Sequence, residues 1–380
     1  MGPRIAVVGS GANGGSVAAD LIRAGHDVVL IEQWPEHVEA MRRAGLRIEM
    51  PGETVTVDVR AHHLCEVCTL RDRFDLVLVL MKAYDTRWAC QLVEPYLRPD
   101  GLVVGLQNGM TADVIADVVG ARRTLGAVIE VSSMMVDPGV VRRYTPPARS
   151  WFALGGLDDS AAARSPEVAG LDDSAAARSP EIAGQDDSAA ARAPEVAGLL
   201  RAAGTVEVVG DIRSAKWMKL VSNATTLAST AMLGLPMLDA LAVPGMRELM
   251  LRAGREAAAV GAALGHRPLP IFGLTPQDMT GAGPARIAEL LLDTLYAGFV
   301  RPGATTTILH DWRKGRRSET GDINGRVVGG AALVPGGAPV NAAIVAIAER
   351  IERGELRPGP AVRDLLAELA GPVPVDSAVE

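Results

Sequence analysis

The stretch Arg4-Ile-Ala-Val-Val-Gly9-Ser-Gly11-Ala-Asn-Gly14-Gly15 decides the fold of this chain. An apolar strand runs directly into a glycine-rich turn, and a helix-forming segment follows. Gly9 permits the tight turn, Gly11 lets the backbone approach a pyrophosphate, and Gly14 lets the helix pack closely on the strand. The helix N–H groups would face the phosphates. The stretch therefore predicts a dinucleotide site made of Gly9, Ser10, Gly11, Ala12, Asn13 and Gly14.

A second strand, residues 26–32, ends in an acid about 20 residues after the glycine turn, as the dinucleotide fingerprint requires. The Glu32 carboxylate can accept hydrogen bonds from ribose hydroxyls, whereas a 2′-phosphate placed there would meet like charge. The next residues, Gln33, Trp34 and Pro35, include no arginine. Glu32 therefore favours NAD over NADP.

Composition indicates a globular protein able to bury large cores. The chain has 380 residues, which suggests two or three domains, and 48% of them are hydrophobic. The net charge of −7 argues against a nucleic-acid surface. The N-terminus carries no export signal, and no apolar run approaches the ~20 residues that span a bilayer. We expect a cytoplasmic location, with neither nucleic acid nor membrane as a partner.

Three cysteines, an odd number, form no disulfide framework. Cys65 and Cys68 follow His62-His63, so a metal or redox site is one alternative. A second ligand cluster at zinc-like spacing is absent, and the segment lies between two predicted strands. We predict surface or packed thiols and no metal site.

Strands and helices alternate from residue 4 to residue 119, a pattern typical of a parallel sheet covered by helices. The predicted strands at 75–81 and 102–106 lack polar alternation, as strands buried on both faces do. Ligands of such sheets bind beyond the carboxyl ends of the strands. Lys82 and Asn108 follow these two strands and are therefore candidate site residues.

Residues 157–198 repeat one 14-residue sequence three times. Only the third copy continues into a helical pattern, residues 194–203, and a strand, residues 206–210. The first two copies, 157–184, are therefore predicted to be a tandem insertion. Each copy has a capping signal but scarcely any apolar face, so we expect a solvent-facing loop or short frayed helices.

After residue 211 the pattern becomes helical, which predicts a second, all-helical domain. Lys219 and Asn223, at i and i+4, share one helix face. A later segment, residues 305–325, is polar in an otherwise apolar region. Taken alone, each of these two segments is typical of a solvated helix face.

Together these residues resemble the ketopantoate reductases (2-dehydropantoate 2-reductases) and their 2-hydroxyacid dehydrogenase relatives. The motifs that carry the resemblance are the glycine turn, Lys82, Gln107-Asn108-Gly109, Trp217-Met-Lys219-Leu-Val-Ser-Asn223, Gly315-Arg-Arg-Ser-Glu319-Thr-Gly-Asp-Ile-Asn324-Gly325 and Ala338-Pro-Val-Asn341. The resemblance implies an α/β Rossmann domain over 1–210 and a helical domain over 211–355 that is similar to the C-terminal part of 6-phosphogluconate dehydrogenase. Residues 356–380 would form a C-terminal extension. A homodimer is expected by the same analogy.

The resemblance also implies the chemistry. Lys219 would be the general acid that protonates the carbonyl oxygen as hydride arrives from the nicotinamide. Glu319 looks like the family glutamate that holds the lysine and the substrate hydroxyl. Asn108 is similar to the asparagine lining the nicotinamide site, and Lys82 to the lysine near cofactor and substrate.

Substrate contacts are implied for Asn223 and for Thr307, which stands where the family commonly has a serine. Two departures matter. Leu227 and Ala304 occupy positions where ketopantoate enzymes usually carry asparagines. A site that lacks hydrogen-bonding groups for a substrate hydroxyl loses discrimination in its favour, so a less polar substrate is expected.

The sequence therefore predicts an NAD-dependent dehydrogenase or reductase that acts on CH–OH groups of a small molecule, either a secondary alcohol or 2-hydroxyacid or its carbonyl counterpart. Ketopantoate reduction is the first alternative. It is not the main prediction, because the NADPH-dependent ketopantoate reductases usually have a basic residue at the position of Glu32. An imine reductase is the second, because the same proton donor serves a C=N bond. The third is a catalytically silent NAD-binding sensor, against which the retention of Lys219 and Glu319 argues.

Overall fold

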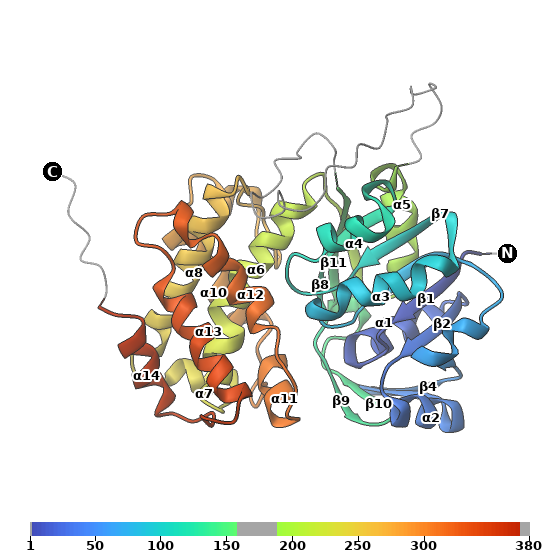
Figure 1. Cartoon of the computed structure of the whole chain (residues 1–380), viewed down its shortest axis with the longest axis horizontal. Coiled ribbons are helices and arrows are strands. Elements are labelled where there is room, and N and C mark those ends of the chain that lie inside the picture. Colours follow the sequence, from blue (N-terminus) through green and yellow to red (C-terminus); the bar gives the residue numbers. More distant parts are fainter. Residues whose placement is uncertain (1, 158–187, 373–380) are drawn as a thin grey trace. The chain divides into compact units, whose positions relative to one another are not determined.

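The computed structural model describes residues 2–157 and 188–372, which divide into two compact units (Figure 1). The first unit reaches to Arg213, apart from Asn108–Met110, and the second contains those three residues and the chain from Ser214 onward. The tandem insertion predicted at 157–184 lies outside the described residues except for Leu157, and so does the tail from residue 373.

An eight-stranded sheet forms the centre of the first unit, in the order β12-β11-β8-β7-β6-β1-β2-β5. Its strands are β1 (Arg4–Val8), β2 (Asp27–Glu32), β5 (Arg60–His63), β6 (Phe74–Val79), β7 (Leu97–Gly105), β8 (Thr124–Glu130), β11 (Trp151–Gly156) and β12 (Thr205–Val208). The predicted α/β fold is confirmed, and β1, β2, β5, β6 and β7 pair in parallel, as predicted for residues 4–119. Beyond that range, β11 runs antiparallel to β8. These two strands are joined without a crossover helix, which a parallel pair would need.

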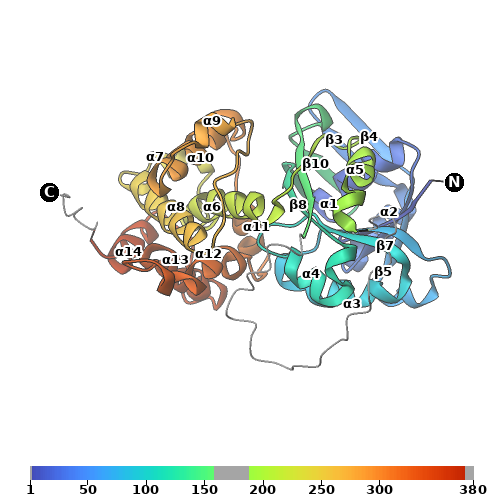
Figure 2. The same cartoon turned by 90° about the horizontal axis from the view of Figure 1, so that it is seen from above.

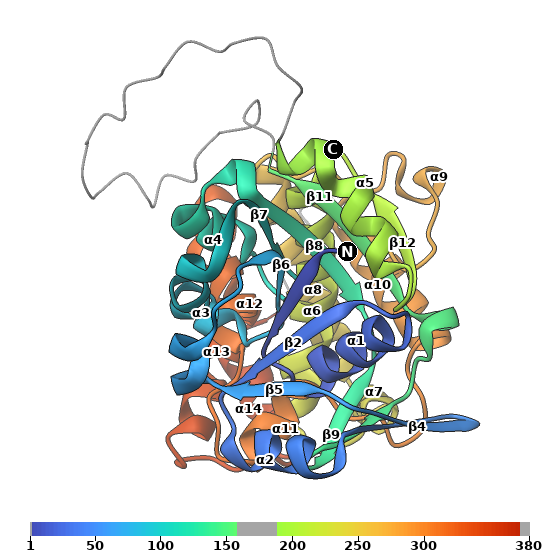
Figure 3. The same cartoon turned by 90° about the vertical axis from the view of Figure 1, so that its right-hand side faces the viewer.

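Helices cover both faces of this sheet (Figure 3). One face carries α1 (Ala12–Arg23), α2 (Pro35–Ala44) and α5 (Ala189–Leu200), and the other carries α3 (Thr86–Val93) and α4 (Ala112–Val119). In β1, Ile5 and Val7 enter the first core while Ala6 and Val8 enter the second. Burial on both faces explains the lack of polar alternation. The third repeat copy supplies the start of α5, where the Ser188 hydroxyl accepts the Ala191 N–H at 3.3 Å.

A second sheet of four strands has the order β4-β3-β10-β9. The sequence predicts a polar pair of strands near residues 47–60, which corresponds to β3 and β4, but not their pairing with β9 and β10. Its strands are β3 (Leu46–Met50), β4 (Glu53–Val57), β9 (Ser133–Asp137) and β10 (Val140–Arg143). At the end of β10, Arg143 is fully buried and ion-paired with Asp20 of α1. The same guanidinium donates to the carbonyls of Thr145 at 2.6 Å and Ala203 at 3.0 Å, and to the Ser150 hydroxyl at 2.9 Å. Arg143 therefore ties four separate segments of the first unit together.

The described part of the second unit is helical, as predicted. Its helices are α6 (Ile212–Ala231), α7 (Met237–Ala242), α8 (Met246–Ala263), α9 (Pro276–Met279), α10 (Pro284–Gly298), α11 (Thr307–Arg313), α12 (Thr320–Gly329), α13 (Pro339–Glu352) and α14 (Val362–Leu369). Helix α14 places Val362 and Leu366 in the same core as α8 and α13. Residues 362–369 of the predicted C-terminal extension thus pack as part of this unit.

Helix α6 lies inside the bundle, beside α8 and α12 (Figure 2). A Cβ atom on Gly254 of α8 would lie 2.4 Å from Thr225 Oγ1, and one on Gly261 would lie 2.0 Å from Trp217 Nε1. Only glycine allows α6 and α8 to approach so closely. The solvated face that segment 216–223 would indicate when taken alone is not found, because these two glycines let a neighbouring helix cover most of α6.

Four hydroxyl groups of α6 hydrogen-bond within the helix. Thr225, Thr226, Ser229 and Thr230 each donate to the carbonyl four residues earlier, at 2.6–2.8 Å. A polar helix can therefore be buried without leaving these groups unsatisfied. Among the described residues, none of the helices is both long and apolar enough to cross a membrane.

We predict that Arg143→Met lowers the free energy of unfolding of the first unit by about 3–5 kcal/mol, because the Asp20 carboxylate would stay buried without its partner. Urea unfolding followed by far-UV circular dichroism measures the effect.

The matched control is Arg142→Met on the same strand. Arg142 pairs with Glu49 at the surface, with 48% of its side chain exposed. Its replacement should leave the unfolding curve nearly unchanged. Equal losses in the two variants would contradict the role assigned to Arg143.

Candidate functional site

The turn between β1 and α1 has the geometry that a pyrophosphate requires. Gly9 has φ +89°, and a Cβ on Gly14 would lie 1.9 Å from the Gly9 carbonyl oxygen. A Cβ on Gly11 would approach only Met135 Cε, at 3.7 Å, so there is space above this residue. No side chain caps the N-terminus of α1. The first-turn N–H groups and the space above Gly11 fit an anion.

Glu32, at the end of β2, is 5% exposed and fixed by three donors. One carboxylate oxygen accepts the N–H groups of Gln33 at 2.9 Å and Trp34 at 3.1 Å, and the other accepts the Ser10 hydroxyl at 3.2 Å. The turn and the carboxylate are thereby held together. Their combination fits the phosphate and ribose of a dinucleotide.

His37 of α2 supports the same turn and was not singled out by the sequence. It is fully buried, and its Nδ1 accepts the Gly139 N–H at 2.8 Å. The ring proton therefore sits on Nε2, which donates to the Ser10 carbonyl at 3.0 Å. The sequence signal for this residue is its position: His37 lies two residues after Pro35, at the start of the helical segment that follows Glu32.

The candidates that follow β6 and β7 are half-buried. Lys82 precedes a short 3₁₀ turn, and its carbonyl and that of Met81 accept the Gln107 amide at 3.3 and 2.8 Å. Asn108 Oδ1 accepts the Asn223 amide of α6 at 3.1 Å. The structure thus brings together two residues that are 115 positions apart in the chain.

Lys219, Asn223 and Leu227 mark one face of α6 at four-residue spacing. After Arg213, every residue of this helix is buried except Lys219 and Leu227, which are half-buried. Asn223, between them, is 4% exposed. Within this stretch the helix is therefore partly exposed only at Lys219, the predicted general acid, and at Leu227.

The segment before α11 lies against the same part of α6. The Thr306 hydroxyl donates to the Leu227 carbonyl at 3.1 Å and also accepts the Leu309 N–H, which makes it the N-cap of α11. Ala304 and Thr307, both half-buried, flank this contact in the chain. Thr306 is thus a positioning residue that the sequence analysis did not identify, although a threonine before a helical pattern is a capping signal.

Glu319 is 4% exposed and occupies the N-cap position of α12. Further along α12, the Asn324 amide donates to the Ala224 carbonyl of α6 at 3.1 Å and to Asn341 Oδ1 at 2.9 Å. The Asn341 amide donates in turn to Glu256 at 2.7 Å. This buried network ties α12 to α6 and explains why the two asparagines are part of the motifs.

Glu256 also accepts the backbone N–H groups of Val340 and Asn341. Burial raises the pKa of this carboxyl above its usual range, and these hydrogen bonds lower it. The network is therefore a polar junction inside the helical bundle, and its role is to hold α8, α12 and α13 together.

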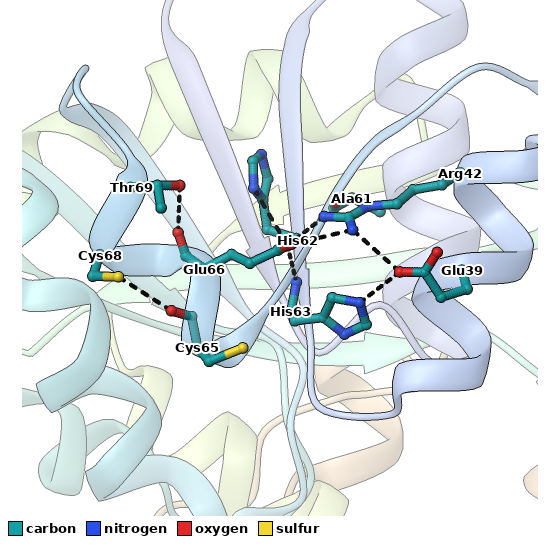
Figure 4. Close-up of polar contacts among 9 residues, drawn as sticks. All are labelled: Glu39, Arg42, Ala61, His62, His63, Cys65, Glu66, Cys68 and Thr69. Atoms are coloured by element: carbon teal, nitrogen blue, oxygen red, sulfur yellow. Dashed lines mark hydrogen bonds and ion pairs between the residues drawn. The ribbon is translucent and has the colours of Figure 1, made fainter.

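The thiol and imidazole groups near the end of β5 do not converge (Figure 4). Cys65 and Cys68 are exposed, free thiols on the 3₁₀ helix Leu64–Thr69. Figure 4 shows the rings of His62 and His63 pointing away from them. In the described part of the chain, no group of three or more His, Cys, Asp or Glu residues could hold a metal ion.

A hydrogen bond and an ion pair occupy the polar side chains of that region instead. His63 Nε2 lies 2.7 Å from a Glu39 carboxylate oxygen, and Arg42 of α2 pairs with Glu66. The hydrogen bond from Arg42 lowers the pKa of Glu66 to about 2. These pairs fasten α2 to the segment after β5, which is a structural role.

Comparison with known proteins gives two family matches. Residues 5–155 match the family described as ketopantoate reductase PanE/ApbA, and residues 211–352 match its C-terminal part. The chain is 26% identical over 374 residues to a 2-dehydropantoate 2-reductase of Mesorhizobium japonicum, which covers 92% of this chain and 99% of that protein.

Two solved structures share the fold. A PanE/ApbA family ketopantoate reductase from Ralstonia eutropha JMP134 superposes with a TM-score of 0.71 at 25% identity, covering 93% of this chain and 99% of the other. The ternary structure of D-mandelate dehydrogenase with NADH and anilino(oxo)acetate gives a TM-score of 0.75 at 18% identity, covering 92% and 99%.

We predict that Gly11→Ala folds normally but binds NADH on the order of tenfold more weakly, the effect of losing about 1.4 kcal/mol. The new methyl group meets only Met135 within the protein, yet it fills the space where the pyrophosphate would approach. Titration of NADH fluorescence and thermal unfolding measure the two effects.

Gly198→Ala is the control, because its Cβ would meet nothing within 4 Å and it lies in α5. This variant should bind NADH as the unmodified chain does. Unchanged NADH affinity in Gly11→Ala would show that the pyrophosphate does not lie over this turn.

Proposed function

The chain belongs to the ketopantoate reductase family, and we propose that it is an NAD-dependent 2-hydroxyacid dehydrogenase or 2-oxoacid reductase whose substrate is less polar than ketopantoate. Like its relatives, it is an oxidoreductase that acts on CH–OH groups. The nicotinamide cofactor, when bound, supplies or accepts the hydride. The residues of the chain bind and orient the substrate and move the proton.

One observation carries the proposed substrate class. Leu227 and Ala304 replace the polar residues usual in ketopantoate enzymes, and the hydrogen bond from Thr306 to the Leu227 carbonyl brings their two segments together. An apolar group of the substrate, rather than a hydroxyl, suits this surface. The ternary complex of D-mandelate dehydrogenase with anilino(oxo)acetate supports a 2-oxoacid of this kind.

The proton donor in this proposal is Lys219. Its half-buried ammonium group on α6 would stabilise the developing alkoxide and protonate it, and in the reverse direction the neutral amine would take the proton. Asn223 and Asn108, already joined at 3.1 Å, would orient the substrate beside it. Glu319 at the start of α12 would hold the lysine and the substrate hydroxyl, and Thr307 would bind the carboxylate.

The cofactor in this proposal is NAD, held by the turn from Gly9 to Gly14 with Lys82 near the nicotinamide end. The buried Glu32 carboxylate supports NAD over NADP because it is already fixed by Ser10 and two backbone N–H groups. Swinging it away to admit a 2′-phosphate would break these hydrogen bonds.

Ketopantoate reduction itself is the second candidate. The names of the curated relatives favour it, and the Mesorhizobium japonicum protein matches over nearly its whole length. The predicted homodimer and cytoplasmic location stay predictions.

We predict that NADH-dependent reduction of 3,3-dimethyl-2-oxobutanoate is at least as efficient as reduction of ketopantoate, measured as kcat/KM from the loss of NADH absorbance. The two acids differ by one hydroxyl group, which makes them a matched pair. A site built to bind that hydroxyl rejects the analogue lacking it by roughly 10⁴-fold, whereas an apolar site does not. A strong preference for ketopantoate would restore the second candidate.

We also predict that Glu32→Gln shifts the NADH to NADPH affinity ratio toward NADPH by about tenfold, or about 1.4 kcal/mol. The glutamine oxygen can still accept the Gln33 and Trp34 N–H groups, so the fold is kept while the charge facing a 2′-phosphate is removed. Fluorescence titration with both cofactors measures the ratio. An unchanged ratio would mean that Glu32 does not face the ribose.

A further inference from the structure

Phe272 has an unusual backbone conformation. Its φ is +60°, and it is the one non-glycine residue with positive φ in the described part of the chain. Gly273 follows with φ +80°, and the Leu274 N–H donates to the Ile271 carbonyl at 3.1 Å. The four residues form a tight turn with positive φ at both central positions. Asparagine or glycine is favoured at the first of these positions, and a bulky residue there is strained.

The ring of Phe272 lies beside the Lys219 ammonium. Its ring centroid lies 4.7 Å from Lys219 Nζ, within the range of a cation–π interaction. The residue is 7% exposed, and the Phe299 ring packs against it with a centroid distance of 5.4 Å and an interplanar angle of 48°. The turn thus places the Phe272 ring next to the Lys219 ammonium, and the Phe299 ring packs against the Phe272 ring.

A lysine side chain is flexible, and a proton donor is effective only when it is held. The donor nitrogen must come within about 2.6–3.2 Å of the oxygen it protonates. The Lys219 side chain has four rotatable bonds, and an aromatic ring beside its ammonium favours some positions of that group over others. Backbone strain that persists in a native structure often marks such a site.

We propose that Phe272 is a positioning residue that holds the Lys219 ammonium in place for proton transfer to the substrate. The proposal rests on the proposed function, because it requires Lys219 to be the proton donor. It extends the active site to the turn at 271–274, which contains none of the family motifs. Phe272 would act through Lys219.

The test compares Phe272→Leu, Phe272→Tyr and Phe299→Leu, using NADH and 3,3-dimethyl-2-oxobutanoate. Leucine keeps an apolar side chain but has no ring, so kcat should fall by about 3- to 30-fold while NADH affinity and the melting temperature change little. Tyrosine keeps the ring face and should restore kcat to within about twofold. Phe299→Leu, which leaves the Phe272 ring in place, should lower kcat less than Phe272→Leu.

A second comparison repeats Phe272→Leu in a Lys219→Ala background. If the ring acts through the ammonium, it should have no further effect on the residual kcat there. An equal loss of kcat in both backgrounds, or wild-type kcat in Phe272→Leu alone, would overturn the proposal. If Lys219→Ala itself kept wild-type kcat, the proposed role of Lys219 would fail instead, so the two failures are distinguishable.

Discussion

The close approach of helix α1 to the turn after β1 is the constraint on which the first unit depends. No side chain larger than a hydrogen atom fits at Gly14, because a Cβ there would lie 1.9 Å from the Gly9 carbonyl oxygen. The approach places the N-terminus of α1 directly above the strand ends. Ser10 of the same turn hydrogen-bonds to both Glu32 and His37, so the turn is joined to the end of β2 and to the start of α2.

Features encoded by neighbouring residues were predictable, and features made by distant ones were not. The glycine turn, the acid at the end of β2 and the strands buried on both faces each have a local signature. The completion of the four-stranded sheet by β9 and β10 does not, since β3 pairs with β10 more than 90 residues away and β9 is only half-buried. Arg143 is similar: next to Arg142 it looks like a surface residue, and only the folded chain supplies Asp20 and three further acceptors.

In the second unit, too, features set by nearby residues were predictable and contacts between distant segments were not. The spacing of Lys219 and Asn223 predicted their common face, but no local pattern indicated that the rest of α6 is buried. That burial depends on Gly254 and Gly261 of α8 and on hydroxyl groups that bond to their own helix. The asparagines of α12 and α13 were visible as motif residues. Their role became clear only when Asn324 was seen to reach the α6 backbone.

Two residues near the proposed proton donor depart from the usual preferences for burial and backbone conformation. A lysine is placed in a helix whose other residues are almost all buried, and a phenylalanine occupies a backbone position suited to asparagine or glycine. Each departure costs stability unless another interaction offsets it. Here the two departures meet, since the Phe272 ring contacts the Lys219 ammonium at 4.7 Å. A cation–π interaction can offset part of the cost of placing an ammonium group at a half-buried position, which gives the strained turn a physical role beside Lys219.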